Sequence, residues 1–213
     1  ASVAEHSGWE IDDTGATTDV DEVRFSASAP STLVLFTGDT GIERIVIGTG
    51  TGASATTTGL GAFNVDAYLL GNGVEIIGNS GANTIEATIF DDILSGGNSV
   101  DRLYGYEGAD TLDGGRGADV MYGGFDDDLY VVDDASDAPI ETADGGVDMV
   151  LASVAHTLKA NVENLTQSGA FSIHATGNAL NNQMVGNAGS NRLWGLAGDD
   201  VLVGNGGNDQ LDG

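Results

Sequence analysis

The chain lacks cysteine altogether and is poor in proline and in basic residues. Its 213 residues include 2 Pro and 6 Lys plus Arg, against 33 Asp plus Glu, which gives a net charge of -27. Without cysteine there is no disulfide framework and no thiolate metal site. A surface this acidic repels phosphate backbones and anionic lipids, which excludes nucleic acid as a partner. No apolar run approaches the roughly 18 residues that span a bilayer, so we expect no transmembrane segment.

Hydrophobic residues and glycine are plentiful. Hydrophobic residues make up 40% of the chain, which is too many for a disordered acidic tail. The chain has 34 glycines. Glycine without proline indicates many tight turns rather than a stiff linker.

A nine-residue repeat organises two parts of the chain. Six units run in register from Gly78 to Val131, and four more run from Gly177 to Asp212. The first position is Gly in nine of these ten units, and the eighth is always large and mainly apolar. The sixth position is Asp or Asn throughout: Asn83, Asp92, Asp101, Asp110, Asp119, Asp128, Asn182, Asn191, Asp200 and Asp209.

Each unit is typical of a tight turn followed by a very short strand. One apolar side chain in nine is too sparse for a helix face but fits a strand that points a single residue inward. Two units then form one 18-residue coil, and stacked coils give an all-β solenoid with two parallel sheets around a thin core. Sixth-position residues 18 apart become neighbours: Asp101 with Asp119 on one edge, and Asp92, Asp110 and Asp128 on the other.

These files of aspartates predict a cation site. Carboxylates stacked at the roughly 4.8 Å strand spacing repel unless a cation lies between them. An oxygen-only site beside free turn carbonyls suits calcium, whereas magnesium demands a stricter octahedron and zinc prefers nitrogen or sulfur. The alternative is a solvated acidic edge that binds no metal.

The unit Gly114–Tyr122, with the sequence GGRGADVMY, resembles the repeat of the RTX (repeats-in-toxin, hemolysin-type) calcium-binding proteins. This resemblance implies a right-handed parallel β-roll with Ca²⁺ in the turns. It also implies that the second and fourth carbonyls and the sixth carboxylate of one turn bind each ion. The first and third carbonyls and the sixth carboxylate of the stacked turn complete the site.

Carried onto this sequence, the resemblance implies about three strong calcium sites and up to three weaker ones. The strong sites would use Tyr106, Gly108 and Asp110 with Gly123, Phe125 and Asp128; Gly97, Ser99 and Asp101 with Gly114, Arg116 and Asp119; and Thr88, Phe90 and Asp92 with Gly105, Glu107 and Asp110. The third departs from the pattern at Phe90, where the turn prefers glycine. The weaker sites pair a neutral asparagine with an aspartate: Asn83 with Asp101, Asn182 with Asp200, and Asn191 with Asp209.

The sequence divides into four segments: 1–77, an irregular β-solenoid lead-in; 78–131, the first array; 132–176, a β-rich spacer; and 177–213, the second array, which stops inside a unit. Strands are predicted in the non-repeat segments at Val20–Phe25, Leu33–Phe36, Ile45–Ile47, Phe63–Val65, Val74–Ile77, Met149–Val154, Val162–Leu165 and Phe171–His174. A Gly/Thr-rich stretch at Thr49–Gly61 separates two of them. A short helix is an alternative over Ala152–Ala160.

Catalytic motifs are missing from the sequence. There is no GxSxG, HExxH, P-loop or dinucleotide fingerprint, and His6, His156 and His174 share no motif. We therefore expect a non-catalytic calcium-binding module, an excised part of a larger secreted or cell-surface bacterial protein. By family resemblance it would leave the cell through a type I secretion channel, fold on binding Ca²⁺ and have a structural or adhesive role.

Two other functions stay open. One is a carbohydrate-binding accessory module that resembles the R-modules of alginate epimerases, with an extracellular glycan or cell surface as partner. A basic or aromatic stripe along one sheet would favour it, although 6 Lys plus Arg argue against an acidic polymer as the ligand. The aromatic candidates are Trp9, Trp194, Tyr104, Tyr106 and Tyr122. The other is a lyase-like solenoid enzyme, for which Arg24, Arg44 and His6 are the only basic candidates in residues 1–77.

Overall fold

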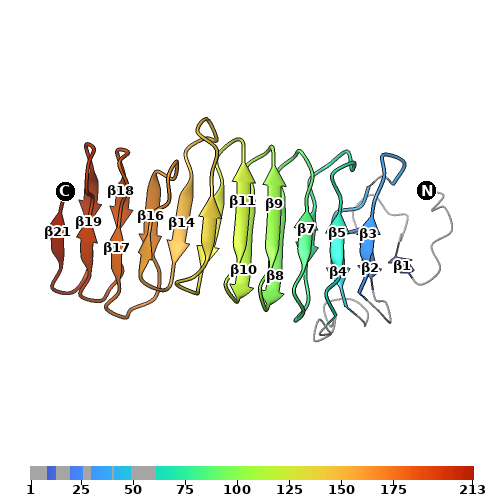
Figure 1. Cartoon of the computed structure of the whole chain (residues 1–213), viewed down its shortest axis with the longest axis horizontal. Coiled ribbons are helices and arrows are strands. Elements are labelled where there is room, and N and C mark those ends of the chain that lie inside the picture. The colour runs from blue at the N-terminus through green and yellow to red at the C-terminus, as the bar shows by residue number, and fades with distance from the viewer. Residues whose placement is uncertain (1–8, 13–19, 26–29, 40, 49–60) are drawn as a thin grey trace.

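The computed structural model describes residues 9–12, 20–25, 30–39, 41–48 and 61–213. It shows an elongated stack of short strands, with the N-terminal strands at one end and the C-terminal strands at the other (Figure 1). His6 and residues 49–60 of the Gly/Thr-rich stretch lie outside the described residues.

The described strands form two layers. The first layer is one eleven-stranded sheet of β1 (Trp9–Asp12), β2 (Glu22–Phe25), β4 (Arg44–Ile47), β6 (Glu75–Ile77), β8 (Ile93–Asn98), β10 (Thr111–Arg116), β12 (Leu129–Val132), β14 (Met149–Ala152), β16 (Asn164–Gln167), β18 (Gln183–Val185) and β20 (Val201–Val203). The second layer begins with a six-stranded sheet of β3 (Thr32–Val34), β5 (Asn64–Asp66), β7 (Thr84–Glu86), β9 (Arg102–Tyr106), β11 (Val120–Gly124) and β13 (Ala138–Ile140). It continues as a four-stranded sheet of β15 (His156–Thr157), β17 (His174–Thr176), β19 (Arg192–Trp194) and β21 (Gln210–Asp212).

The pairing is that of a parallel β-solenoid. From β2 onward, successive strands alternate between the layers, and each pairs in parallel with a strand one coil away. β1 lies in the same sheet as β2 and pairs with it antiparallel. Leu112 of β10 lies in register with Leu94 of β8 and Tyr130 of β12, each 18 residues away. The predicted all-β roll of two stacked parallel sheets is confirmed.

The core is a thin layer of apolar residues between the two sheets, and each sheet contributes one inward row to it. The eighth-position residues from Ile85 to Leu193 are fully buried. Leu202 is partly buried, and Leu211 is 45% exposed because β21 is the last strand of its sheet. One inward side chain per unit is therefore enough to fill a core this thin, as the repeat predicts.

The non-repeat segments add strands to the same stack. Strands lie in or beside most of the predicted stretches, although β17 begins only at His174 and Phe171 is 84% exposed. The helix considered over Ala152–Ala160 is wrong, because Ala152 ends β14 and His156–Thr157 form β15. The Ser153 N–H donates to the Val132 carbonyl of the neighbouring coil over 2.9 Å, which a helix would not allow. Stacking between coils thus prevails over local helix propensity.

Candidate calcium-binding edges

The sixth-position side chains lie inside the turns and are shielded from solvent. The five aspartates of the first array, Asp92, Asp101, Asp110, Asp119 and Asp128, are each at most 3% exposed. Asn83, Asn182 and Asn191 are equally buried, whereas Asp200 and Asp209 near the C-terminal end are half-buried. Buried carboxylates of this kind need a partner for each oxygen.

One oxygen of each array aspartate joins two coils. The Asp92 N–H donates to Asp110 Oδ1 over 2.8 Å, and the Asp110 N–H donates to Asp128 Oδ1 over 2.8 Å. On the opposite edge, the Asp101 N–H donates to Asp119 Oδ1 over 2.7 Å. The predicted stacking of residues 18 apart is present on both edges, and backbone-to-carboxylate bonds fix it.

The other oxygen is left unsatisfied in most of these aspartates. Among the described residues, Oδ2 is buried without a hydrogen bond in Asp101, Asp110, Asp119, Asp128 and Asp200. Leaving a buried carboxylate oxygen unsatisfied is costly, so these positions fit a cation better than an empty turn. The donor set is oxygen alone, which is the chemistry that calcium prefers.

Burial without compensation also changes the acidity of these groups. Desolvation raises the pKa of Asp110 and of Asp128 to about 8, and that of Asp119 to about 7, with neighbouring carboxylates adding to the rise. Desolvation raises the pKa of Asp92 and of Asp101 to about 6. The backbone N–H bonds oppose the shift in every case without cancelling it. The turns are thus unfavourable places for negative charge until a cation enters.

First-position glycines make room for the orphaned oxygens. A Cβ atom on Gly105 would lie 2.0 Å from Asp110 Oδ2, and one on Gly123 would lie 2.1 Å from Asp128 Oδ2. Both distances are far too short for two atoms that are not bonded to each other, so a side chain at either position would displace the carboxylate. Glycine is therefore needed at the first position because the sixth-position carboxylate occupies the space that a side chain would fill.

Second-position residues expected to offer carbonyls lie in register with the second position of the next coil. Gly97 lies in register with Gly115, and Tyr106 lies in register with Gly124. The Tyr106 carbonyl accepts a bond of 2.8 Å from the Phe125 N–H, so only its second lone pair is free for a metal. Strands β8 to β11 extend partly into these turns. The same turns contain the remaining expected carbonyl donors, which are Ser99, Gly105, Glu107, Gly108, Gly114, Arg116 and Gly123.

Asp92 differs from the other aspartates of its file. Its Oδ2 accepts bonds from the Thr88 N–H (2.8 Å) and the Thr88 hydroxyl (2.9 Å), while Oδ1 accepts from the Val74 N–H (2.7 Å). Both oxygens are thus satisfied within the protein. The third expected site departs from the pattern at Thr88 as well as at Phe90.

The asparagines close their turns without an ion. Asn83 donates from Nδ2 to the Phe63 carbonyl (2.6 Å) and accepts at Oδ1 from the Asn79 N–H (2.9 Å). The same pair of contacts recurs for Asn182 with the Glu163 carbonyl and Asn178 N–H, and for Asn191 with the Ile173 carbonyl and Asn187 N–H. The side-chain amide of each asparagine donates to a carbonyl of the neighbouring coil, and so links two coils as a cation would beside an aspartate.

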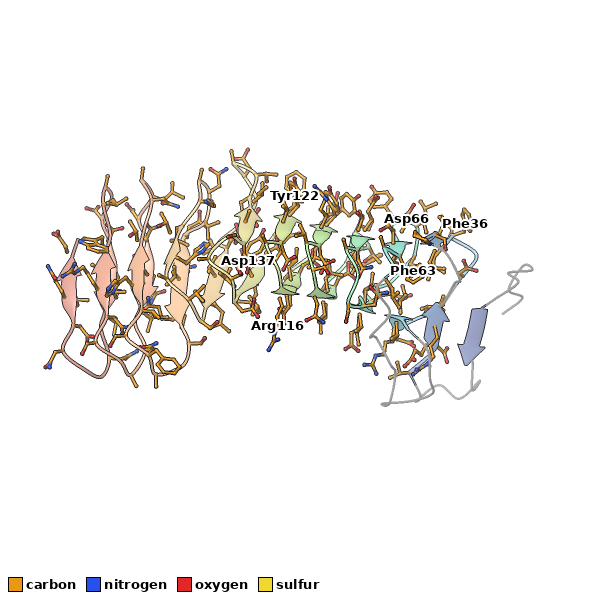
Figure 2. The ribbon with its side chains drawn as sticks, turned by 60° about the horizontal axis from the view of Figure 1, so that its bottom comes forward. Phe36, Phe63, Asp66, Arg116, Tyr122 and Asp137 are labelled. Atoms are coloured by element: carbon orange, nitrogen blue, oxygen red, sulfur yellow. The ribbon has the colours of Figure 1, made fainter. Side chains whose placement is uncertain are left out.

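Sequence reasoning missed two members of the aspartate files. The Asp119 N–H donates to Asp137 Oδ1 over 3.0 Å, and the Asp128 N–H donates to Asp148 Oδ1 over 2.9 Å. Both side chains are buried, and Asp137 lies inside the stack in Figure 2. Asp137 follows Asp119 by 18 residues and could have been found by spacing, but Asp148 follows Asp128 by 20 because its turn is longer.

Tyrosines gather on the outer face of the second layer. The rings of Tyr104 and Tyr122 stack at 4.7 Å with an interplanar angle of 1°, and Tyr106 meets Tyr68 edge-on at 4.9 Å. Tyr104 and Tyr106 are 6.2 Å apart, which joins the two pairs. We call Tyr68, Tyr104, Tyr106 and Tyr122 the tyrosine face. Tyr122 lies on the same side of the stack as Asp66 (Figure 2).

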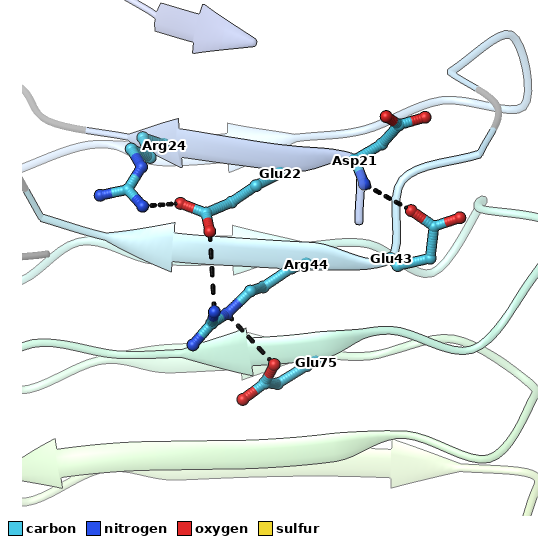
Figure 3. A network of polar contacts seen from close by, with 6 residues as sticks. All are labelled: Asp21, Glu22, Arg24, Glu43, Arg44 and Glu75. Atoms are coloured by element: carbon cyan, nitrogen blue, oxygen red, sulfur yellow. Dashed lines mark hydrogen bonds and ion pairs between the residues drawn. The ribbon is translucent and has the colours of Figure 1, made fainter. Parts of the chain in front are cut away.

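Arg24 and Arg44, the two arginines considered for a lyase, are held in ion pairs. Arg44 lies between Glu22 and Glu75 on adjacent strands, at 3.8 Å and 3.1 Å, and Arg24 pairs with Glu22 (Figure 3). His156 is buried, and desolvation lowers its pKa to about 4. None of these contacts resembles a catalytic cluster.

A family model for the RTX calcium-binding nonapeptide repeat matches residues 77–112, 96–130, 104–137 and 176–211. Searches of curated proteins and of solved structures gave no significant match. The part of the chain that the structure describes contains no helix long and apolar enough to cross a membrane.

Proposed function

Because this chain carries RTX calcium-binding nonapeptide repeats in a parallel β-solenoid, we propose that its arrays fold when calcium binds and unfold when calcium is removed. The buried, unpartnered Oδ2 atoms of Asp101, Asp110, Asp119 and Asp128 support this proposal most directly. Each needs a partner that the described part of the chain does not supply.

The coupling follows from two opposing free energies. Without calcium, ionised carboxylates repel along each edge, and a core of one side chain per unit contributes little against chain entropy. With calcium, each ion satisfies the orphaned oxygens and attracts both stacked turns, so that binding free energy becomes folding free energy.

The sites are proposed to differ in strength. Asp110 with Asp128, and Asp101 with Asp119, would form the strong sites, because each pair contains two orphaned Oδ2 atoms. Asp92 with Asp110 contains one, since Thr88 satisfies Asp92. The three asparagine positions would bind weakly or not at all, because their amide groups already close the turn.

The setting we propose is outside a bacterial cell. By family resemblance, the chain would pass a type I secretion channel while unfolded and fold where calcium is plentiful, with a structural or adhesive role. The calcium dependence described above supports this order of events, because a chain that folds only with calcium stays unfolded where calcium is scarce.

Counting bound ions tests the proposal. Native mass spectrometry at increasing calcium should show cooperative loading of at least the two strong sites. A chain that stays ion-free at millimolar calcium would overturn it.

The tyrosine face favours a second function, binding of a neutral glycan. Aromatic rings with exposed area stack on the apolar faces of sugars, and Tyr68 is 44% exposed. A glycan with acidic groups is disfavoured, because the net charge of -27 would repel it. A glycan array with calcium present tests this. Tyr104→Ala with Tyr122→Ala should abolish binding, Phe171→Ala should not, and equal effects would exclude the face.

A further inference from the structure

A cluster of three buried carboxylates lies just beyond the first array. One oxygen each from Asp128, Glu141 and Asp148 lie within 4.8 Å of one another. Asp148 is fully buried, Asp128 is 3% exposed and Glu141 is 8% exposed. Glu141 and Asp148 belong to the turn of residues 141–148, which lies outside both nonapeptide arrays and is longer than a repeat turn.

The cluster has two oxygens without a partner. Asp128 Oδ1 accepts from the Asp110 N–H and Asp148 Oδ1 accepts from the Asp128 N–H, but the Oδ2 atoms of Asp128 and Asp148 have no hydrogen bond among the described residues. Three carboxylates this close and this dry cannot all stay ionised without a cation.

Tyr130 holds the third carboxylate in place. It stands at the eighth position of its unit, where the other units have aliphatic residues or Met, and it is fully buried. Its hydroxyl accepts a bond of 2.7 Å from the Gly123 N–H and donates to Glu141 Oε1. Glu141 Oε2 accepts from the Thr142 N–H over 3.2 Å. The core therefore contains a polar group, the Tyr130 hydroxyl, whose hydrogen bond orients the Glu141 carboxylate.

Charge distinguishes this cluster from the array sites. Two stacked aspartates balance the charge of one divalent ion, whereas three carboxylates exceed it by one. Affinity for calcium rises with the number of charged ligands at a site.

We propose that Asp128, Glu141 and Asp148 bind one further hard divalent cation, calcium, and that this site ends the first array with the highest affinity in it. The inference rests on the proposed calcium-binding function. Asp128 is shared with the preceding strong site, so filling the end site also favours the next ion along that edge.

Counting ions in matched variants tests the inference. Glu141→Gln removes one charge but keeps a carbonyl oxygen that can accept from Tyr130. We expect it to bind one calcium ion fewer than wild type, or to bind its tightest ion at least about 10-fold more weakly. Asp144→Asn removes one charge from an exposed position of the same turn, and we expect the wild-type count and affinity.

The outcomes separate the two proposals. A wild-type chain that binds no calcium overturns the proposed function. A wild-type chain that loads calcium while Glu141→Gln matches it in count and affinity overturns the end site alone. If Glu141→Gln fails to fold in saturating calcium, Glu141→Asp retains the charge with a shorter reach. We then expect the wild-type ion count with at least about 10-fold weaker binding of the tightest ion, and unchanged affinity would overturn the site.

Discussion

The Asp92 N–H donates to Oδ1 of Asp110, 18 residues later, over 2.8 Å. The same bond joins Asp110 to Asp128, and Asp101 to Asp119, so each edge has a continuous series of backbone-to-carboxylate contacts. Because only Oδ1 takes part, the second oxygen of Asp110 is left buried and unsatisfied. The register of the coils is therefore set by the protein, and the need for an ion arises at the other oxygen.

Asp110→Asn should have opposite effects with and without calcium. The asparagine keeps an acceptor for the Asp92 N–H but brings no charge. In calcium we expect at least about a 10-fold loss of affinity at the strong site that Asp110 forms with Asp128, and a further loss at the weaker site that it forms with Asp92. In chelator we expect a small rise in the free energy of unfolding, because the cost of burying this carboxyl, whether charged or protonated, is gone. Calorimetric titration and urea unfolding measure the two quantities.

Asp209→Asn is the matched control for Asp110. Its aspartate is half-buried near the C-terminal end and faces Asn191, so we expect a smaller loss of calcium affinity. Equal losses in the two variants would count against the stacked-pair assignment.

Stability without calcium should fall as pH rises. The pKa of Asp110 and of Asp128 is raised from 3.8 to about 8. A raised pKa gives stability that is complete below the unfolded value and is lost as pH passes the folded value. Melting temperatures in chelator should therefore decrease from about pH 4 to about pH 8. With saturating calcium the trend should reverse, because protons compete with the ion. A chelated protein that gains stability across this window would contradict the raised pKa values.

Gly115→Ala should disrupt the stacked turns. Gly115 has a φ of 76°, and an added Cβ would lie 2.2 Å from the Gly97 carbonyl oxygen of the neighbouring coil. We expect the free energy of unfolding in calcium to fall by at least about 1 kcal/mol. Gly38→Ala adds the same methyl group where no atom lies within 4 Å, so we expect a change within about 0.5 kcal/mol. Thermal unfolding that does not distinguish the two variants would refute the turn argument.

Leu112→Ala should be costly for a protein with so thin a core. Leu112 is fully buried between Leu94 and Tyr130, and we expect a loss of about 2–5 kcal/mol in calcium. Ile93→Ala, on the exposed face of the same sheet, should cost less than about 1 kcal/mol. Denaturant unfolding compares the pair, and similar costs would mean that the eighth position does not form the core.

Most of the fold could be predicted from the nine-residue repeat. A strict nine-residue period fixes which residue points inward and which faces the turn, and Leu112 and Asp110 lie where the period predicts. Prediction was weaker wherever the period is broken. The longer turn before Asp148 moves it out of step, and Asp137 was missed because Val132 and Pro139 replace the usual first and eighth residues of its unit.

Some details depend on contacts between coils that no local pattern shows. The Thr88 hydroxyl donates a hydrogen bond to the Asp92 carboxylate, and the presence of threonine at the second position does not by itself predict this bond. The stacking of Tyr104 on Tyr122 follows from register once the coils are 18 residues long, but their ring geometry requires coordinates. The helix considered near Ala152 was wrong because pairing with the neighbouring coil is not encoded in local propensity.

Circular dichroism during calcium titration and chelation tests the central claim most directly. At neutral pH, we expect the chelated chain to lack most of its β signal, calcium to restore it cooperatively, and added chelator to remove it again. The same β signal before calcium, in calcium and after chelation would contradict calcium-coupled folding.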